Sequence, residues 1–266
     1  MDGWCVSFAV SVHRLRTNFM KKQFLLFLTI FATMSVAMGQ DVADEAAPAS
    51  PITKNYHWSF GLQGGYVRNT LVTDLSYLDG FTYAKYSPGN TYGLRIGYSP
   101  ARWLTFRLDA VMIQKNSDLG HVYQYYSTRY TMSTHTTNQY VNVPLVLMFN
   151  VGKNVQLHGF GGAYAGYWLS CHRTGESYSM PFSIYGDTEC NKYDEEYTFS
   201  EVRDNRYDVG FTWGAGISTV ISHRFEVGAE VRWYYGIFDT QKEYMANVPP
   251  RYNTTFVIQG GVSYRL

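Results

Sequence analysis

The sequence predicts an all-β protein, an eight-stranded antiparallel up-and-down barrel that crosses a membrane. Three observations carry this prediction. Apolar and polar residues alternate with a period of two in eight segments, short and long connections alternate between those segments, and only 16% of the 266 residues are charged. A typical soluble domain carries about 25% charged residues. After the N-terminus, no segment shows the period of about 3.6 residues that indicates a helix.

The composition excludes two other classes of protein. Lys and Arg number 22 against 21 Asp and Glu, so there is no basic surplus to neutralise the phosphates of a nucleic acid. The mean hydropathy is −0.24, and no apolar run of about 20 residues follows the N-terminus, which excludes a bundle of membrane-spanning helices. The abundant Tyr (24), Phe (16) and Gly (24) residues favour or punctuate β-structure instead.

The N-terminus has the pattern of a secretory signal. Met20, Lys21 and Lys22 precede an apolar run over residues 24–37, and Ala37 and Gly39 are the small residues expected before a cleavage site. We predict that residues 1–39 are a signal peptide and that the true translation start is Met20. An uncleaved anchor is the alternative, although the run is shorter than the about 20 residues of a span. Residues 40–56 are expected to be a flexible periplasmic lead-in to a barrel domain over 57–266.

The eight predicted strands follow in order. The first begins at Trp58, and Trp58, Phe60 and Leu62 share its apolar face. The other seven occupy residues 92–98, 104–110, 141–149, 155–168, 207–217, 225–233 and 256–266. A tilted strand crosses the hydrocarbon of a bilayer in about 9 to 11 residues, which is close to the length of most of these segments.

The connections between these strands alternate in length. Three are short, at residues 99–102, 152–154 and 222–224; four are long and polar, at 68–90, 116–136, 170–205 and 236–251. Compact soluble domains seldom contain loops beyond about 12 to 15 residues. Short turns on one side and long loops on the other are typical of a transmembrane barrel with periplasmic turns and extracellular loops. The sheet must close, because every backbone group in lipid needs a partner.

Four short motifs keep a shared order along these strands. They are Leu104-Thr-Phe-Arg-Leu-Asp109 ahead of Gln114-Lys115, Val141-Asn-Val-Pro144, Asp208-Val-Gly210 with Gly214-Ala-Gly216, and Glu230-Val-Arg232 with Tyr235-Gly236. With them, the span from about Trp58 to Leu266 resembles the PorT-like family of Gram-negative outer-membrane β-barrel proteins. Asn142, Asn116 and Leu266 depart from the family's Glu, Gly and Phe. The resemblance implies an outer-membrane location, recognition of the last strand by the barrel-assembly machinery and, through the family name alone, accessory service in protein secretion.

The alternation also predicts which charged side chains enter the barrel. An eight-stranded barrel is just wide enough for side chains to fill its lumen. Buried charges are tolerated when they are paired, so we expect a mutually neutralising network, with a narrow polar pore as the alternative. The residues expected there are Arg95, Arg107, Asp109, Asp208, Glu226, Glu230 and Arg232, with Arg265 as a further candidate.

Histidines in the long loops raise an enzymatic alternative. His121, His135 and His172 lie near serines in the sequence, and some outer-membrane barrels modify lipids with His and Ser. No spacing fixes a triad, since triads are recognised by geometry, so solvated histidines are favoured. His158 is expected to face the lumen as a structural imidazole. The neighbouring serines are Ser117, Ser127, Ser133 and Ser170.

Two cysteines, Cys171 and Cys190, fall in the third long loop. The oxidising cell envelope favours a disulfide between them. A metal site that adds His172 and Glu189 is the alternative, although this order matches no known zinc spacing. The same loop carries aromatic residues among acidic ones, which predicts either a recognition surface or a cap over the barrel. These aromatic residues are Tyr178, Phe182, Tyr185, Tyr193, Tyr197 and Phe199.

The function predicted from these features is that of a non-enzymatic outer-membrane barrel with a filled lumen, whose loops bind or anchor at the cell surface. A lipid-modifying enzyme that depends on His121 or His135 is one alternative. A secreted lipocalin-like carrier, with its apolar face inward, is another. The expected partners are outer-membrane lipid, the barrel-assembly machinery and an extracellular ligand of the loops. Neither nucleic acid, nor a cofactor, nor a metal is indicated.

Overall fold

The computed structural model describes residues 57–72, 81–126, 128–153, 155–181, 189–222, 224–242 and 251–266. All of these belong to one compact unit, Asn55–Leu266. The predicted signal peptide and lead-in, residues 1–56, lie outside the described residues, as do Ser127, Phe182 and Tyr185. Within the described ranges, no helix has the length and apolar character needed to cross a membrane.

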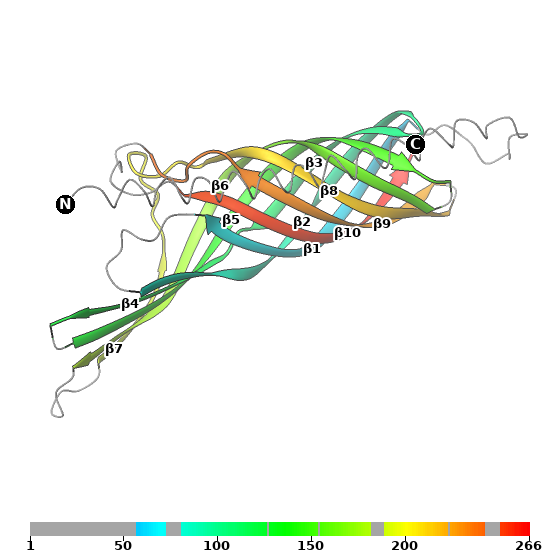
Figure 1. Ribbon diagram of the computed structural model, residues 1–266. Coiled ribbons are helices and arrows are strands. Elements are labelled where there is room, and N and C mark those ends of the chain that lie inside the picture. The colour runs from blue at the N-terminus through cyan, green and yellow to red at the C-terminus, as the bar shows by residue number, and fades with distance from the viewer. Residues whose placement is uncertain are drawn as a thin grey trace, which may run out of the picture. The chain divides into compact units, whose positions relative to one another are not determined.

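Ten antiparallel strands form one sheet (Figure 1). They are β1 Trp58–Val72, β2 Phe81–Ala101, β3 Leu104–Gln114, β4 Ser117–Tyr125, β5 Thr128–Val151, β6 Val155–Pro181, β7 Glu189–Glu196, β8 Tyr207–Ser222, β9 Phe225–Gly236 and β10 Tyr252–Arg265. All except β4 and β7 form a closed ring in the order β1, β2, β3, β5, β6, β8, β9, β10 and back to β1. The predicted antiparallel barrel is present. The predicted count of eight strands covers the ring alone and misses β4 and β7.

The ring closes where the first and last strands meet. The register between β1 and β10 runs without a shift from Ser59 opposite Arg265 to Val72 opposite Tyr252. The final residue extends this seam, because Leu266 N donates to Trp58 O at 2.8 Å. A closed ring leaves no strand edge around the barrel wall, which meets the requirement that backbone groups in lipid be paired.

The three short connections join β2 to β3, β5 to β6, and β8 to β9. Gly152 lies in the second of them and has a positive φ of 111°. A Cβ at this position would overlap the Val155 carbonyl oxygen. Only glycine meets both conditions, so the chain reverses here because of the residue at position 152.

Apolar side chains face outward from the ring and polar ones inward. Leu62, Tyr92 and Phe211 are 65%, 60% and 56% exposed, whereas Asn142, Thr212 and Gln259 are at most 3% exposed. This is the reverse of a soluble protein and fits a barrel surrounded by lipid. A lipocalin-like carrier needs its apolar face inward, so the observed orientation argues against that alternative.

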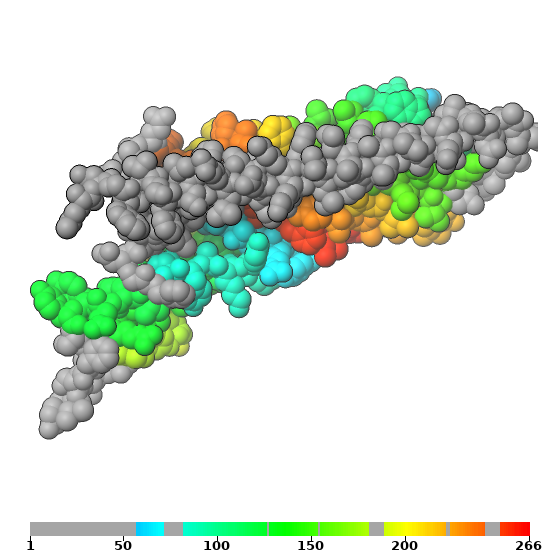
Figure 2. Space-filling model, viewed as in Figure 1, coloured from blue at the N-terminus to red at the C-terminus, as the bar shows by residue number. Residues whose placement is uncertain are grey.

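Three ring strands continue beyond the barrel on the side of the long connections, and β4 and β7 join them there (Figure 1). We call this five-stranded part, in the order β2, β4, β5, β6, β7, the projecting sheet. Its end carries the green β4 and β5 residues beside the yellow-green residues of β6 and β7 (Figure 2). Much of what the sequence predicted as long loops is therefore strand. The projecting sheet consists of residues 81–86, 117–125, 128–139, 170–181 and 189–196.

Candidate functional site

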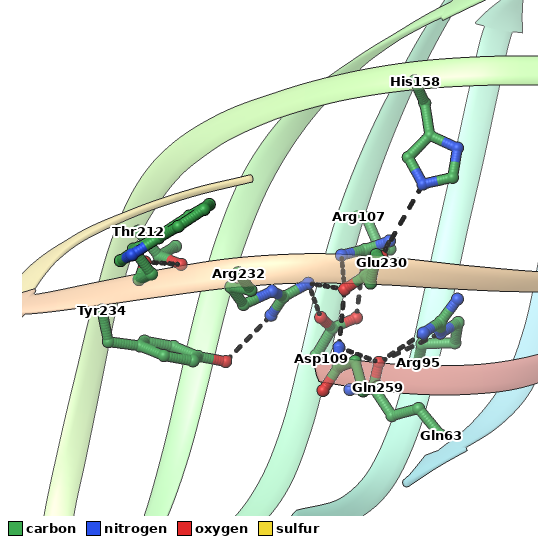
Figure 3. Close-up of polar contacts among 11 residues, drawn as sticks. Gln63, Arg95, Arg107, Asp109, His158, Thr212, Glu230, Arg232, Tyr234 and Gln259 are labelled. Atoms are coloured by element: carbon green, nitrogen blue, oxygen red, sulfur yellow. Dashed lines mark hydrogen bonds and ion pairs between the residues drawn. The ribbon is translucent and has the colours of Figure 1, made fainter. Parts of the chain in front are cut away.

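An ion pair joins opposite walls of the barrel. Arg107 lies on β3 and Glu230 on β9, which are four strands apart in either direction around the ring. Arg107 Nη1 donates to Glu230 Oε2 at 2.8 Å, and Nη2 donates to Oε1 at 3.0 Å (Figure 3). The two residues are only 3% and 5% exposed. Bidentate pairs of this kind are strong and directional, so side chains close the lumen at this level.

Asp109 and Arg232 complete what we call the central charge group, which consists of Arg107, Asp109, Glu230 and Arg232. Arg232 Nη2 lies 2.9 Å from both Asp109 Oδ2 and Glu230 Oε1, and Arg107 Nε lies 3.3 Å from Asp109 Oδ1. Both guanidinium groups also lie over the ring of Phe160, each 4.9 Å from its centroid. Two positive charges meet two negative ones, so the group is neutral despite its burial.

Two glutamines connect Arg95 to this group. Gln259 Nε2 donates to Glu230 Oε1 at 2.6 Å and to Gln63 Oε1 at 3.1 Å. Arg95 donates to the same Gln63 oxygen through Nε at 3.2 Å and Nη2 at 2.5 Å. His158 also faces the lumen, with Nε2 3.9 Å from Glu230 Oε2 (Figure 3). Hydrogen bonds between charged side chains and glutamine amides therefore connect the walls of the lumen.

Asp208 belongs to a separate group nearer the long-loop end. Lys115 Nζ lies 2.5 Å from Asp208 Oδ2, Tyr164 OH donates to Oδ1 at 2.9 Å, and Asn253 Nδ2 donates to Oδ2 at 3.1 Å. Lys115 is fully buried, although it was not among the residues predicted to enter the lumen. The alternation that places Arg107 and Asp109 inside reaches Lys115 on the same face, and it was the signal that could have identified this lysine.

Glu226 and Arg265 form a third pair near the short-turn end. Arg265 Nη2 lies 2.5 Å from Glu226 Oε2, and both side chains keep over a fifth of their surface exposed. The structure thus brings the predicted lumen charges together in three groups rather than in one network. The division follows from depth along the barrel, which a period of two does not encode.

Aromatic side chains fill the long-loop end of the lumen. Trp168 stacks on Tyr140 with ring centroids 5.7 Å apart, and Phe199 packs against Trp168 at 4.9 Å. Tyr197 also packs on this cluster, so part of the third loop forms a cap over the barrel. The buried members of the cluster are Val67, Ile113, Tyr140, Tyr164, Trp168, Cys171, Tyr234 and Val257.

Asp204 holds the cap in place. It accepts hydrogen bonds from Tyr197 OH and Ser200 N, both at 2.8 Å, and from Arg203 Nε at 3.0 Å. Burial raises the pKa of the Asp204 carboxyl, but these donors more than offset burial and leave the pKa below its usual value. Burial and the bond to Asp204 raise the pKa of Tyr197 to about 12. A backbone bridge between Asp204 and Gln241 ties the cap to the loop after β9.

The two faces of the projecting sheet differ in chemistry. One face carries stacked tyrosines, with the rings of Tyr123 and Tyr130 5.0 Å apart, and a hydrogen bond between Thr134 and Tyr193. The other face carries an ion pair between Lys192 and Glu176 and two contacts between an imidazole and a carboxylate, His135 with Asp118 and His172 with Asp194. The sheet is thus a folded surface of defined pattern rather than a set of solvated loops.

A match to a protein family agrees with this geometry. A family model described as an outer membrane protein beta-barrel domain matches residues 44–242 of the 266-residue chain. The chain belongs to this family. It is an outer-membrane β-barrel protein, and the apolar surface of its ring is the surface that this location requires. No curated protein matches the sequence.

This chain is similar to several solved structures of outer-membrane proteins, among them the following three. Ail, the attachment invasion locus protein of Yersinia pestis, is 15% identical, with 79% of this chain and 99% of that chain covered and a TM-score of 0.36. The outer membrane protein OprG from Pseudomonas aeruginosa is 11% identical, with 79% and 97% covered and a TM-score of 0.44. Neisserial surface protein A is 12% identical, with 78% and 97% covered and a TM-score of 0.36.

The predicted disulfide is wrong in this outer-membrane protein, because both cysteines are free. Cys190 lies opposite Tyr178 in the ladder between β6 and β7, whereas Cys171 lies opposite Asn138 of β5. The seven residues from Cys171 to Tyr178 span about 23 Å of strand, far beyond the reach of a disulfide. Among the described residues, no three His, Cys, Asp or Glu side chains gather as a metal site requires.

The loop histidines of this protein contact neighbours other than the serines predicted from the sequence. His121 Nδ1 lies 2.5 Å from Thr82 Oγ1. His135 Nδ1 bonds Asp118 Oδ1 and lies 3.5 Å from Ser87 Oγ, while its Nε2 lies 3.3 Å from Thr137 Oγ1. A Ser-His-Asp relay needs the serine and the carboxylate on different ring nitrogens. Ser87 shares Nδ1 with Asp118, so no such relay exists there.

Proposed function

We propose that this protein is a closed, non-enzymatic anchor, which crosses the outer membrane with each ring strand and presents the projecting sheet outside the cell as a binding surface. The observation that carries the proposal is the bidentate contact between Arg107 and Glu230 across the lumen. Side chains that meet from opposite walls leave no continuous channel along the axis.

The rest of the lumen supports a closed barrel. The central charge group is neutral and nearly inaccessible to solvent, whereas a water-filled pore exposes its lining charges. Above this group, the stacked rings of Tyr140 and Trp168 fill the long-loop end. In outer-membrane barrels the short turns are periplasmic and the long connections extracellular, and this rule assigns the projecting sheet to the cell surface.

Conductance in a planar lipid bilayer tests the closed lumen. We expect the wild-type protein to insert without discrete current steps. Stable ohmic steps from the wild-type protein would overturn the proposal of a closed barrel.

Thiol labelling on intact cells tests the orientation. A membrane-impermeant maleimide should label the exposed Cys190 and spare the buried Cys171. The Cys190→Ser variant is the matched control and should lose the label. Failure to label Cys190 on intact cells, with labelling after lysis, would place the sheet on the periplasmic side.

An acyl hydrolase is a second candidate, favoured by one observation. Asp118, His135 and Thr137 form a chain in which the carboxylate and the hydroxyl contact different nitrogens of the imidazole. This is the arrangement of a relay with threonine as nucleophile. Release of fatty acid from outer-membrane lipid that is lost in both His135→Gln and Thr137→Ala would establish this activity. Equal release by wild-type and variant membranes would leave the anchor as the function.

The likeness to the PorT-like family adds a narrower proposal, accessory service in protein secretion. It rests on the sequence motifs and the family name, so it is an argument by analogy. A deletion strain with unchanged secretion would remove it. Outer-membrane lipid around the apolar ring and the barrel-assembly machinery at β10 are the partners that accompany membership in such a family.

A further inference from the structure

The strand β7 is the last of the projecting sheet, and one of its two edges faces away from β6. Among the described residues, β7 pairs with β6 alone. Tyr197 N donates to Cys171 O at 2.9 Å, one residue beyond the ladder and in the same register. Hydrogen-bonded and non-bonded pairs alternate in antiparallel sheets, so Glu195, Tyr193 and Asn191 bond to β6. The N–H and C=O groups of the intervening residues lie in the plane of the sheet and point outward from its edge, away from β6. These residues are Cys190, Lys192, Asp194 and Glu196.

This edge lacks the usual structural protection of an exposed strand. It contains no proline, its register with β6 has no bulge, and seven of its eight residues are exposed. Natural edges are commonly blocked by proline, a bulge or a covering segment, because a free edge is a template for another strand. Charged side chains are the remaining protection here. Their pattern therefore selects which strand the edge accepts.

A second copy of β7 fits that pattern in one register. Antiparallel pairing that engages all four free residues sets Cys190 against Glu196, and Lys192 against Asp194, of the other copy. Two-fold symmetry repeats each contact, so Lys192 and Asp194 meet twice with opposite charge. A shift of the register by two residues in one direction sets Lys192 against Lys192 of the other copy, and a shift in the other direction sets Asp194 against Asp194. Like charges meet in both shifted registers, so neither is favoured. Lys192 and Asp194 contact Glu176 and His172 of their own sheet, yet 72% and 74% of their side-chain surfaces stay exposed to a second copy.

We propose that two copies of this protein join through their β7 edges into one continuous antiparallel sheet. The inference rests on the proposed function, since it assigns a partner to the surface that the projecting sheet presents outside the cell. β6 runs without interruption from the barrel wall into the projecting sheet, where β7 lies against it (Figure 1). Antiparallel pairing reverses the strand direction, so the two barrels lie at opposite ends of the joint sheet. That arrangement connects facing membranes.

Clustering of lipid vesicles that carry the reconstituted protein tests this pairing. Wild-type vesicles should cluster, as followed by light scattering. Vesicles that carry only Lys192→Asp, or only Asp194→Lys, set like charges against each other twice. Their association should be weaker than that of wild-type vesicles by about tenfold or more. A mixture of the two variants restores both opposite-charge contacts and should cluster again. Lys85→Asp, a matched charge change on β2 at the other side of the same sheet, should cluster like the wild type.

The outcomes separate the pairing from the proposed function. Charge variants that cluster as well as the wild type, or a mixture that fails to recover, would overturn the self-pairing. Dispersed wild-type vesicles would overturn it too, while labelling of Cys190 on intact cells would leave the proposed function standing. Wild-type vesicles could also stay dispersed while the wild-type protein binds a soluble oligolysine peptide and the Lys192→Pro variant does not. The edge would then accept a foreign strand, and the pairing with a second copy would be overturned. A closed membrane barrel usually resists detergent until it is boiled and migrates faster in a gel before boiling than after it. A charge variant without this difference has a folding defect, and the other charge variant then decides the question.

Discussion

Replacing Glu230 by glutamine tests how much the central charge group contributes to the stability of the barrel. Glu230 accepts four hydrogen bonds of 2.6–3.0 Å, two from Arg107 and one each from Arg232 and Gln259. Glutamine keeps the size of the side chain and removes its charge. Two buried guanidinium groups would then share the carboxylate of Asp109 alone.

The expected loss follows from burial. Removing one partner of a buried ion pair costs about 3–5 kcal/mol, because the other charge stays desolvated. We expect Glu230→Gln to lose about 3 kcal/mol, the lower end of that range, since the amide oxygen still accepts from one donor. Glu226→Gln is the matched control. Its partner Arg265 and Glu226 itself are partly exposed, and pairs of that kind contribute about 0–1 kcal/mol.

Urea unfolding in lipid vesicles, followed by tryptophan fluorescence, measures both variants against the wild type. Replacing Arg107 by Met and Glu230 by Leu together removes one charge of each sign, so the double variant should be more stable than Glu230→Gln. The reasoning is refuted if Glu230→Gln unfolds within about 1 kcal/mol of the wild type, or if it is no less stable than Glu226→Gln.

Three further predictions concern other parts of the chain. Lys115→Met leaves the Asp208 carboxylate buried with two neutral donors and should cost about 3–5 kcal/mol in the same urea assay, with part of the loss recovered by adding Asp208→Asn; an unchanged midpoint would contradict the pair. Gly152→Ala should cost about 1–3 kcal/mol, because alanine must adopt the positive φ of the turn between β5 and β6, and a variant that unfolds at the wild-type urea concentration would show that the turn relaxes. The pKa of Asp204 is lower in the folded protein than its ordinary value of 3.8, so its stabilisation of the cap is complete above that value and is lost as the pH falls through the folded pKa. Amide hydrogen exchange of residues 197–206, corrected for its intrinsic pH dependence, should therefore rise below pH 3.8 in the wild type, and Asp204→Asn should exchange fast already at about pH 6.

The ring strands could be predicted because two different environments act on them. Lipid selects apolar residues on one face, and the lumen selects polar or small ones on the other, so the alternation is strong in stretches such as 207–217 of β8 and 256–266 of β10. The same alternation put Arg107 and Glu230 inside. It did not reveal that they meet, because their contact depends on β3 and β9 being opposite in the ring, and depth along the axis leaves no mark in a period of two.

The projecting sheet could not be predicted in the same way. Both of its faces contact water, so nothing selects apolar residues on one side; residues 128–137 are mostly Thr, Tyr and Ser on both faces. Their high β-propensity was the remaining signal. The disulfide failed for a related reason. Residues 171 and 190 are close enough in sequence to bond within a compact loop, but the extended hairpin of β6 and β7 sets Cys190 opposite Tyr178.

The charge balance of the lumen argues for function at the surface. The central charge group contains two arginines and two carboxylates, all nearly inaccessible to solvent and bonded to each other. Charges that are balanced and buried in this way are out of reach of a solute. The projecting sheet presents the opposite situation, because no other described residue pairs with the outer edge of β7 and the charged side chains of this strand are exposed. Exposed backbone groups at the edge of a sheet are what such a surface offers a partner strand, and seven of the eight residues of β7 are exposed.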